Sequence, residues 1–385
     1  MARSITVNLS SPDIINMTGR WTFNKYLKVS YSWSNAPSGM KSTVPIDSNK
    51  YKPGDLVSVD NTMTATTAYK DESAKKYYKF SGWNKSGEFN ITSNTSISGS
   101  WDNGTSAPSM VDFGKLSVGS TFMLGKYQVE SETPWDIEWE IVHQTNDYQI
   151  AMTKRIIDLR PFDAKEPNNT NSDRKLSGNN NWQYSNIEQW MNSDQASWYS
   201  AQHQYDAPPS SANVWNYSNG TTYNAYDSHK GFLYYWSADE KALLKDMTLT
   251  LANNTVTDGG GSYTWTGKVW LPTYTQMGGG QNNGISEGEA FSKFTNNSSR
   301  IKSLHPNCAA NNEYAKLENY ASGKTHWYWM SSAYPSNSFS VHTVSNAGSI
   351  GNRNNAYYGN CGLAPCICLP RTGSFGTPPD LNYVD

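Results

Sequence analysis

Three of the four cysteines stand close together near the end of the chain, where a thiol pair could carry out redox chemistry. Cys361, Cys366 and Cys368 follow Cys308 in the last quarter of the 385 residues. Thiol chemistry needs an activated thiolate with a base or a cation beside it. Cys366 and Cys368 instead lie two apart in an apolar stretch, too close along one strand for an ordinary disulfide with each other. The spacing matches none of the usual zinc sites, so we expect buried free thiols.

The other residue types that could do chemistry are scattered. Glu138 and Glu140 share one face of an expected strand but have no recognisable partner, so we expect a solvated surface rather than a glycosidase pair. The six histidines lack the close spacing of metal ligands. Two glycine runs, 259–261 and 278–280, lack the strand-to-helix context of a phosphate loop. The sequence therefore predicts no catalytic residue, no metal and no cofactor.

One polar and aromatic segment has the composition of a binding surface. Residues 352–360 read Asn-Arg-Asn-Asn-Ala-Tyr-Tyr-Gly-Asn and lie between two apolar stretches, 328–332 and 362–369, which we expect to be buried strands. Asparagine supplies adaptable hydrogen bonds, tyrosine an amphipathic ring and arginine a forked cation. An ordinary solvated loop is the alternative, since asparagine and glycine also dominate turns. Two tyrosines beside an arginine favour the binding surface.

Composition and charge exclude several classes of partner. A charged fraction of 17% and a net charge of -2 give no electrostatic basis for binding nucleic acid or an anionic membrane. No run approaches the roughly 20 apolar residues of a membrane-spanning helix. Fifteen Trp and 25 Tyr among many polar residues are typical of extracellular β-rich proteins. Because no signal peptide precedes the first strand-like pattern, we expect a virion component, with a bacterial surface or secreted protein as the alternatives.

The first hundred residues read as a small all-β module. Alternating apolar and polar residues predict strands at 29–33, 56–59 and 77–80, with turn residues between them. The segments Tyr51-Lys52-Pro53-Gly54-Asp55, Phe80-Ser81-Gly82-Trp83 and Ile97-Ser98-Gly99-Ser100-Trp101 resemble the Listeria-Bacteroides repeat. That resemblance implies an immunoglobulin-like or β-grasp-like module that serves as a spacer or stalk.

The remainder reads as a larger α+β domain. Strands are predicted at 139–142, 148–152, 269–271, 327–330, 338–344 and 363–369. Three helix starts carry serine followed three residues later by glutamate, the capping signature: Ser185 with Glu188, Ser237 with Glu240, and Ser286 with Glu289. The predicted organisation is a strand or attachment arm at 1–20 that includes Ile5–Leu9, the β module at 21–102, a linker at 103–112, the large domain at 113–370 and a tail at 371–385.

Several segments of the large domain, in order, resemble a bacterial domain family of unknown function related to the C-type lectin and formylglycine-generating-enzyme folds. They include Trp139-x-Ile141-Val142, Ile187-Glu188-Gln189-Trp190-Met191, Trp270-Leu271-Pro272-Thr273, Tyr328-Trp329-Met330-Ser331-Ser332 and Gly362-Leu363-Ala364-Pro365. The closing strands also resemble the variable proteins of diversity-generating retroelements, in which this face of a C-type lectin fold binds the ligand. The fold class expected is thus multidomain and β-rich, with an immunoglobulin-like or β-grasp-like module and a C-type lectin domain.

The resemblance implies a set of ligand-binding residues between the framing strands. They are Tyr334, Ser336, Asn337, Ser338, His342, Ser345, Asn352, Arg353, Asn354, Asn355, Tyr357, Tyr358 and Asn360. Glu166-Pro167-Asn168 matches the tripeptide with which calcium-dependent lectins hold calcium and sugar, but the later Trp-Asn-Asp partner is missing, so we expect no calcium site.

These observations together predict a non-enzymatic receptor-binding protein, an adhesin on a phage particle. Its expected partners are a host cell-surface receptor, either glycan or protein, and other virion proteins, with self-association as a homo-oligomer left open. A capsid decoration or structural protein is the first alternative. An oxidase of the formylglycine-generating type is the second, although the motif that accompanies its cysteine pair is missing here.

Overall fold

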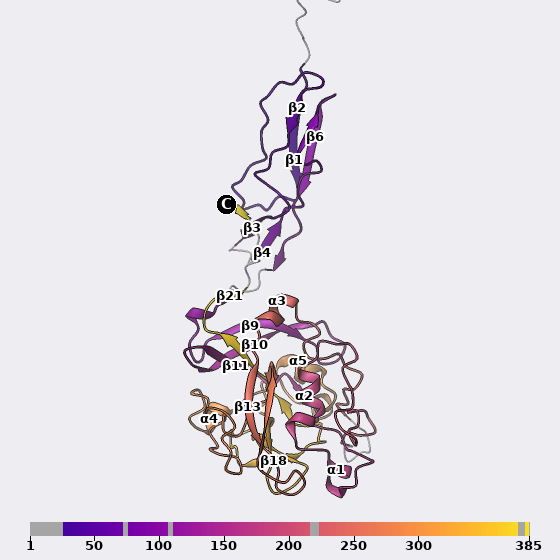
Figure 1. Cartoon of the computed structure of the whole chain (residues 1–385), viewed down its shortest axis with the longest axis vertical. Coiled ribbons are helices and arrows are strands. Elements are labelled where there is room, and N and C mark those ends of the chain that lie inside the picture. The colour runs from indigo at the N-terminus through magenta and orange to yellow at the C-terminus, as the bar shows by residue number, and fades with distance from the viewer. Residues whose placement is uncertain (1–25, 72–75, 107–110, 216–222, 376–381, 385) are drawn as a thin grey trace, which may run out of the picture. The chain divides into compact units, whose positions relative to one another are not determined.

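The computed structural model describes residues 26–71, 76–106, 111–215, 223–375 and 382–384, which form two compact, β-rich units (Figure 1). The smaller unit comprises the chain up to Ala107 together with Pro378–Asp385, and the larger unit spans Pro108–Thr377. The division at Ala107 lies inside the range 103–112, which was expected to be a linker but also contains the short strands Thr105–Ser106 and Val111–Asp112. The strand expected at Ile5–Leu9 lies outside the described residues. The protein is therefore a multidomain β-rich chain.

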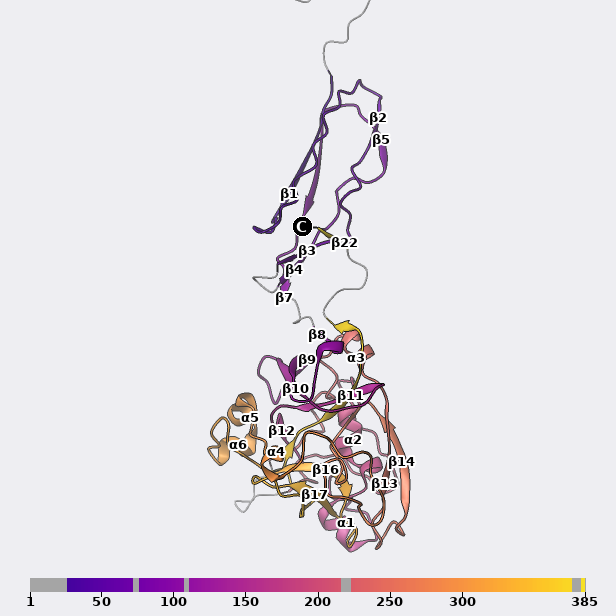
Figure 2. The same ribbon diagram turned by 90° about the vertical axis from the view of Figure 1, so that its left-hand side faces the viewer.

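The smaller unit is built from short strands in three sheets. Its strands are β1 (Val29–Ser34), β2 (Leu56–Ser58), β3 (Thr67–Asp71), β4 (Lys76–Lys79), β5 (Glu88–Asn90), β6 (Thr95–Ser100), β7 (Thr105–Ser106) and β22 (Asn382–Val384). β1 pairs with β6 in parallel and β2 with β5 in antiparallel orientation, while the third sheet has the order β22-β3-β4-β7. Strand β22 lies in the range 371–385, which was expected to be a C-terminal tail, and pairs with β3 in parallel (Figure 2).

The repeat-like motifs of the smaller unit have a packing role. Phe80 and Trp101 are each 1% exposed and form one of its core clusters together with Met63. A Cβ atom at Gly99 would lie 2.3 Å from the Phe80 ring, so only glycine lets β6 approach this ring so closely. Gly82 adopts a φ of 84°, which glycine tolerates without strain.

The larger unit contains two five-stranded sheets. Their orders are β15-β20-β11-β10-β9 and β12-β19-β16-β17-β18. A hairpin of β13 and β14 and the short pair of β8 and β21 complete its strands. The strands are β8 (Val111–Asp112), β9 (Thr121–Tyr127), β10 (Trp135–Gln144), β11 (Tyr148–Thr153), β12 (Asp158–Leu159), β13 (Met247–Ala252), β14 (Ser262–Gly267), β15 (Val269–Trp270), β16 (Tyr328–Ala333), β17 (Ser340–Val344), β18 (Asn352–Asn355), β19 (Gly362–Leu363), β20 (Cys366–Pro370) and β21 (Ser374–Phe375).

Six short α-helices lie between these strands in the described part of the unit. They are α1 (Ser172–Ser177), α2 (Asn186–Met191), α3 (Ala238–Leu243), α4 (Asn297–Arg300), α5 (Pro306–Asn311) and α6 (Glu313–Leu317). None of the helices in the described ranges is long and apolar enough to cross a bilayer. Within the larger unit, β18 and α1 lie at the end opposite β9 and α3 (Figure 1).

Two of the three predicted helix starts are confirmed and the third is wrong. Ser185 caps α2, and Ser237 with Glu240 forms a complete capping box at α3. No helix begins after Ser286, because the backbone N–H of Glu287 donates to the hydroxyl of Thr275 and Gly288 adopts a φ of 102°. Long-range hydrogen bonds thus override a local capping signal.

Candidate functional site

The predicted ligand-binding residues occupy more than one environment. Strand β18 pairs with β17 at the edge of its sheet, so the segment expected as an exposed insert is partly a strand. Side chains alternate along a strand, so Arg353 and Asn355 point to one face while Asn352 and Asn354 point to the other. His342 lies directly opposite Arg353 in the register of the two strands. These two residues therefore share a face.

An arginine–aromatic cluster forms on this face from Tyr274, Tyr334, His342 and Arg353. The guanidinium carbon of Arg353 lies 4.2 Å from the centre of the Tyr334 ring. The His342 ring lies between two tyrosines, 5.3 Å from Tyr334 and 4.6 Å from Tyr274, measured between ring centres. Tyr274 was missed from the sequence, because it follows β15 far from the polar segment and only tertiary packing brings it to His342.

The position of Tyr274 is fixed by a buried polar network behind the cluster. Its backbone N–H donates to the hydroxyl of Ser332 over 2.7 Å, and this hydroxyl in turn donates to the Glu287 carboxylate. Glu287 is fully buried, and burial raises its pKa although hydrogen bonds from Ser332 and Asn282 oppose the shift. The cluster is therefore supported by groups that do not themselves reach the surface.

His342 is a buried imidazole. It is 7% exposed, no side chain among the described residues bonds either ring nitrogen, and the backbone of Asn352 is the hydrogen-bonding group beside it. Burial lowers its pKa to about 4; the backbone of Asn352 opposes this shift, and the charge of Arg353 adds to it. His342 is thus neutral at pH 7, and both of its ring nitrogens are buried.

Arg353 is an exposed cation held in place by an aromatic ring. Within the described residues, no hydrogen bond or ion pair engages its guanidinium group. A guanidinium that lies over a ring keeps its forked N–H donors available for a planar acceptor. The cluster therefore offers a pre-positioned cation beside a neutral imidazole.

Lowering the pH from 7 to 5 should destabilise the larger unit through His342. The unfolded imidazole takes up a proton near pH 6.5, whereas folded His342 stays neutral down to a pKa of about 4. The unfolded state binds more protons in this window, so stability falls as the pH falls. His342→Phe keeps a ring in the stack but cannot titrate, so the wild type should lose about 2 kcal/mol more than this variant between the two pH values. Urea unfolding measures the difference, and equal losses would contradict a buried neutral imidazole.

Tyr357 and Tyr358 belong to a second aromatic group. Their ring centres are 4.9 Å apart, and Tyr358 lies 5.2 Å from the ring of Trp215. Both tyrosines are half-buried, and the backbone N–H of Tyr357 donates to the carbonyl of Ser177. These rings help to pack the β18 end of the larger unit. The backbone carbonyl of the nearby Asn360 accepts a hydrogen bond from the His326 ring over 2.8 Å.

Three residues of the predicted set, Ser338, His342 and Ser345, were expected to project from the surface, but the structure buries all three side chains. Ser338 is 0% exposed, and its carbonyl accepts hydrogen bonds from the Asn180 backbone and the Arg174 side chain. Ser345 is 5% exposed, and its hydroxyl accepts from two backbone N–H groups of its own turn. Asn337 likewise uses its side-chain oxygen to cap the turn before β17, while Ser336 remains exposed. The buried serines hold the loops beside the cluster.

Two of the three carboxylates singled out from the sequence, Glu140 and Glu166, are engaged by other side chains. Glu140 was expected on a solvated surface, but it is 6% exposed and pairs with Lys154 at 2.7 Å and Lys293 at 2.9 Å. Glu166 is 1% exposed and faces Asn169, Asn179 and His203. In the described part of the chain, no group of three or more acidic, histidine or cysteine side chains has an arrangement that could hold a metal ion.

All four cysteines are buried and unpaired. Burial raises the pKa of every thiol, well above its ordinary value at Cys308 and Cys361 and to about 11 at Cys368. A protonated, inaccessible thiol is a poor nucleophile. The cysteines therefore act as small core residues in this structure.

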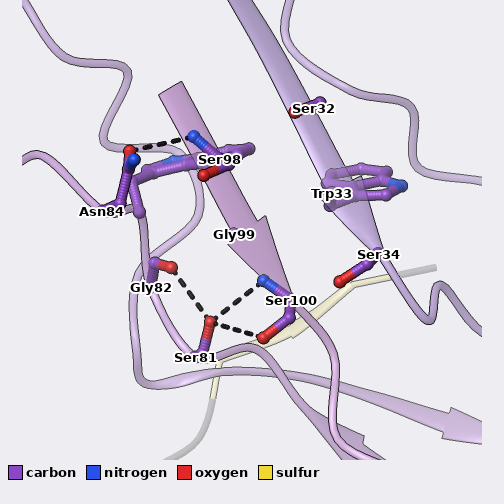
Figure 3. A pocket seen from close by; sticks show the side chains of 10 residues that line it. Ser32, Trp33, Ser34, Ser81, Gly82, Asn84, Ser98, Gly99 and Ser100 are labelled. Atoms are coloured by element: carbon purple, nitrogen blue, oxygen red, sulfur yellow. Dashed lines mark hydrogen bonds between the residues drawn. The ribbon is translucent and has the colours of Figure 1, made fainter. Parts of the chain in front are cut away.

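The smaller unit has a groove of about 550 Å³ beside β1 and β6 (Figure 3). Serines alternate along both strands, and the hydroxyl of Ser81 accepts the backbone N–H of Ser100 at one end of the groove. The Asn84 side chain accepts the N–H of Ser98 at the other end. None of the predicted ligand-binding residues lies in this unit.

The comparison with protein families identifies the larger unit. Residues 147–371, more than half of the chain, match the model of the domain of unknown function DUF6273. The chain therefore belongs to the DUF6273 family. No curated protein and no solved structure matches the chain.

Proposed function

We propose that the protein is a non-enzymatic receptor-binding protein, an adhesin of a phage particle, and that the arginine–aromatic cluster is its contact surface. The observation that carries the proposal is the Arg353 guanidinium, which is exposed, stacked on Tyr334 and not engaged by other described residues. We also propose a specific fold for each unit: a C-type-lectin-like fold for the larger unit and an immunoglobulin-like or β-grasp-like fold for the smaller one.

The chemistry of the cluster favours an acidic group on the receptor. A guanidinium binds carboxylate, phosphate or sulfate through two parallel hydrogen bonds. No carboxylate contributes to the pKa shift of His342, and the charged group that does contribute is Arg353. An anion would therefore meet the Arg353 cation beside a neutral, buried imidazole. Modest affinity at one site would be multiplied by many copies on a particle.

Two alternative functions, an oxidase and a structural protein of the particle, would require other features of the chain. An oxidase would need a reactive thiol, and the raised pKa values and burial of the cysteines weigh against it. A capsid decoration or structural protein would need its exposed face for particle assembly instead of receptor binding. Deleting residues 351–360 would not separate these functions cleanly, since it removes strand β18. Single substitutions at the surface are the better test.

Arg353→Ala should weaken binding to acidic cell-surface polymers by about ten- to a hundredfold, because charge-assisted hydrogen bonds are lost. The probes are sialylated and sulfated glycans and teichoic acid, each with a neutral counterpart, measured on the full chain by surface plasmon resonance. Arg353→Lys keeps the charge but loses the fork and should bind with intermediate affinity.

Lys324→Ala is the matched control, because Lys324 also lies over a tyrosine ring, at 3.6 Å from the centre of Tyr320, outside the cluster. It should leave binding unchanged. Equal binding by wild type and Arg353→Ala would refute the contact surface. Loss of particle assembly in Arg353→Ala, with binding intact, would favour the structural alternative.

A further inference from the structure

We propose that the larger unit has a second binding site, a pocket around Glu130 and His229 that takes one neutral saccharide unit. The pocket has a volume of about 320 Å³, at the small end of the range for small-molecule sites, which is about 300–1,000 Å³. Neither residue belongs to the arginine–aromatic cluster, so this site does not depend on the function proposed for Arg353.

The polar wall of the pocket is fixed by a fully buried arginine. Arg160 donates to Glu130 over 3.0 Å and to Nδ1 of His229 over 3.2 Å, and it also bonds the Asp158 carboxylate and two backbone carbonyls. Nε2 of His229 lies 3.3 Å from the second carboxylate oxygen of Glu130. Because Nδ1 accepts from Arg160, the ring proton lies on Nε2 and faces Glu130.

This arrangement suits binding and not proton transfer. Both nitrogens of His229 are engaged, so the imidazole is not free to act as a base. Burial alone would raise the pKa of Glu130. The hydrogen bond from His229 and the charge of Arg160 outweigh burial, so the pKa of Glu130 is lowered. An ionised carboxylate accepts hydrogen bonds only, and each of its oxygens can accept a second one. Glu130 therefore offers the pocket two acceptor positions for hydroxyl donors.

The remaining walls match a ring with one apolar and one polar side. Trp190 and Phe232 line the pocket and are each 1% exposed. Half-buried Tyr235 also lines it, with the Lys230 ammonium 5.0 Å from the centre of its ring. The hydroxyl of Tyr235 donates to the Gln128 side chain, which holds the ring in place. Ser131 and Ser228 add hydroxyl groups around the opening. Aromatic rings beside directed polar groups are suited to sugars, whose C–H faces are apolar and whose edges carry hydroxyls.

Charge balance selects a neutral ligand. Glu130 and Lys230 line the pocket with opposite charges, and behind them Arg160 pairs with Asp158 at 2.7 Å. An anion would be attracted by Lys230 but repelled by Glu130, and an ammonium group would be attracted by Glu130 but repelled by Lys230, so the pocket favours neither charge. A neutral polyol gains hydrogen bonds from both without leaving either charge uncompensated.

The test uses three sugars of nearly one shape and different charge: glucose, glucuronate and glucosamine. Ligand-observed NMR on the full chain should show glucose binding with Kd on the order of mM, and weaker binding of the two charged sugars. Glu130→Gln should reduce glucose affinity at least about tenfold, since it removes a charged acceptor. Tyr235→Ala, which leaves the buried arginine untouched, should also reduce it, and thermal unfolding checks that both variants fold.

Three results would overturn the proposal. The first is that neither glucose nor galactose, mannose or N-acetylglucosamine binds the wild type. The second is that glucosamine binds more tightly than glucose, which would indicate an ammonium site. The third is that glucose binding survives both Glu130→Gln and Tyr235→Ala, or is lost in Arg353→Ala, which would place the sugar elsewhere.

Discussion

Replacing Arg160 with methionine should destabilise the larger unit by about 3–5 kcal/mol, because it leaves a buried carboxylate without its cation. The side chains of Arg160 and Asp158 are both 0% exposed, and the two groups lie 2.7 Å apart. Asp158 would keep hydrogen bonds from the Tyr127 hydroxyl and the Asn312 side chain but lose its counter-charge. Urea unfolding of the full chain, followed through the transition of the larger unit, measures the loss.

Arg300→Met is the matched control for this prediction. Arg300 is also buried, at 7% exposed, but it donates to the Met277 carbonyl and to the Asn297 side chain, and it has no acidic partner among the described residues. Its removal should therefore cost only about 1–3 kcal/mol, the effect of unsatisfied neutral acceptors. The double variant Arg160→Met with Asp158→Asn should be less destabilised than the sum of its parts. Equal losses in the two arginine variants would show that the ion pair is not the dominant interaction.

Removing residues 378–385 should destabilise the smaller unit by about 2–3 kcal/mol and leave the larger unit unchanged. The deletion removes β22, whose residues 382–384 pair in parallel with Thr67, Ala68 and Tyr69 of β3. Each lost backbone hydrogen bond is worth about 1 kcal/mol net, and the buried edge of β3 would become exposed to water. Hydrogen exchange of the β3 amides should speed up, while amides of β10 and β11 keep their protection.

A point substitution in β22 distinguishes the loss of strand pairing from the other effects of deleting residues 378–385. Tyr383→Pro removes one backbone donor in the middle of β22, whereas Tyr383→Ala keeps it. Proline should reproduce most of the effect of the deletion on the β3 amides, and alanine should not. Unchanged exchange rates at β3 in both the deletion and the proline variant would show that β22 contributes nothing to this sheet.

The features predicted most accurately from the sequence are the strands and helix starts that depend on neighbouring residues. The apolar alternation at 139–142 and 148–152 corresponds to β10 and β11, and the serine caps at Ser185 and Ser237 begin α2 and α3 as expected. These features need only neighbouring residues, whose periodicity is visible along the chain. The four thiols, expected to be buried and free, are so in the structure for the same reason, since they lie in apolar surroundings.

The site was less accessible to prediction because it depends on contacts between distant segments. Tyr274 meets His342 only through the packing of the loop after β15 on the second sheet. Ser338 was predicted to project outward, but the distant residues Asn180 and Arg174 bury it. Glu130 and His229 carried no local signal, because Arg160, from a third segment, brings them together.

The discontinuity of the smaller unit has a consequence for synthesis on the ribosome. Strand β3 emerges early, whereas its partner β22 is translated roughly 300 residues later. At about 5–20 residues per second, that delay lasts on the order of 15–60 s. During this time the larger unit can fold as a continuous segment, while one edge of β3 remains open to pairing with another nascent chain. Slow translation or crowded polysomes should therefore affect the yield of the smaller unit before that of the larger one.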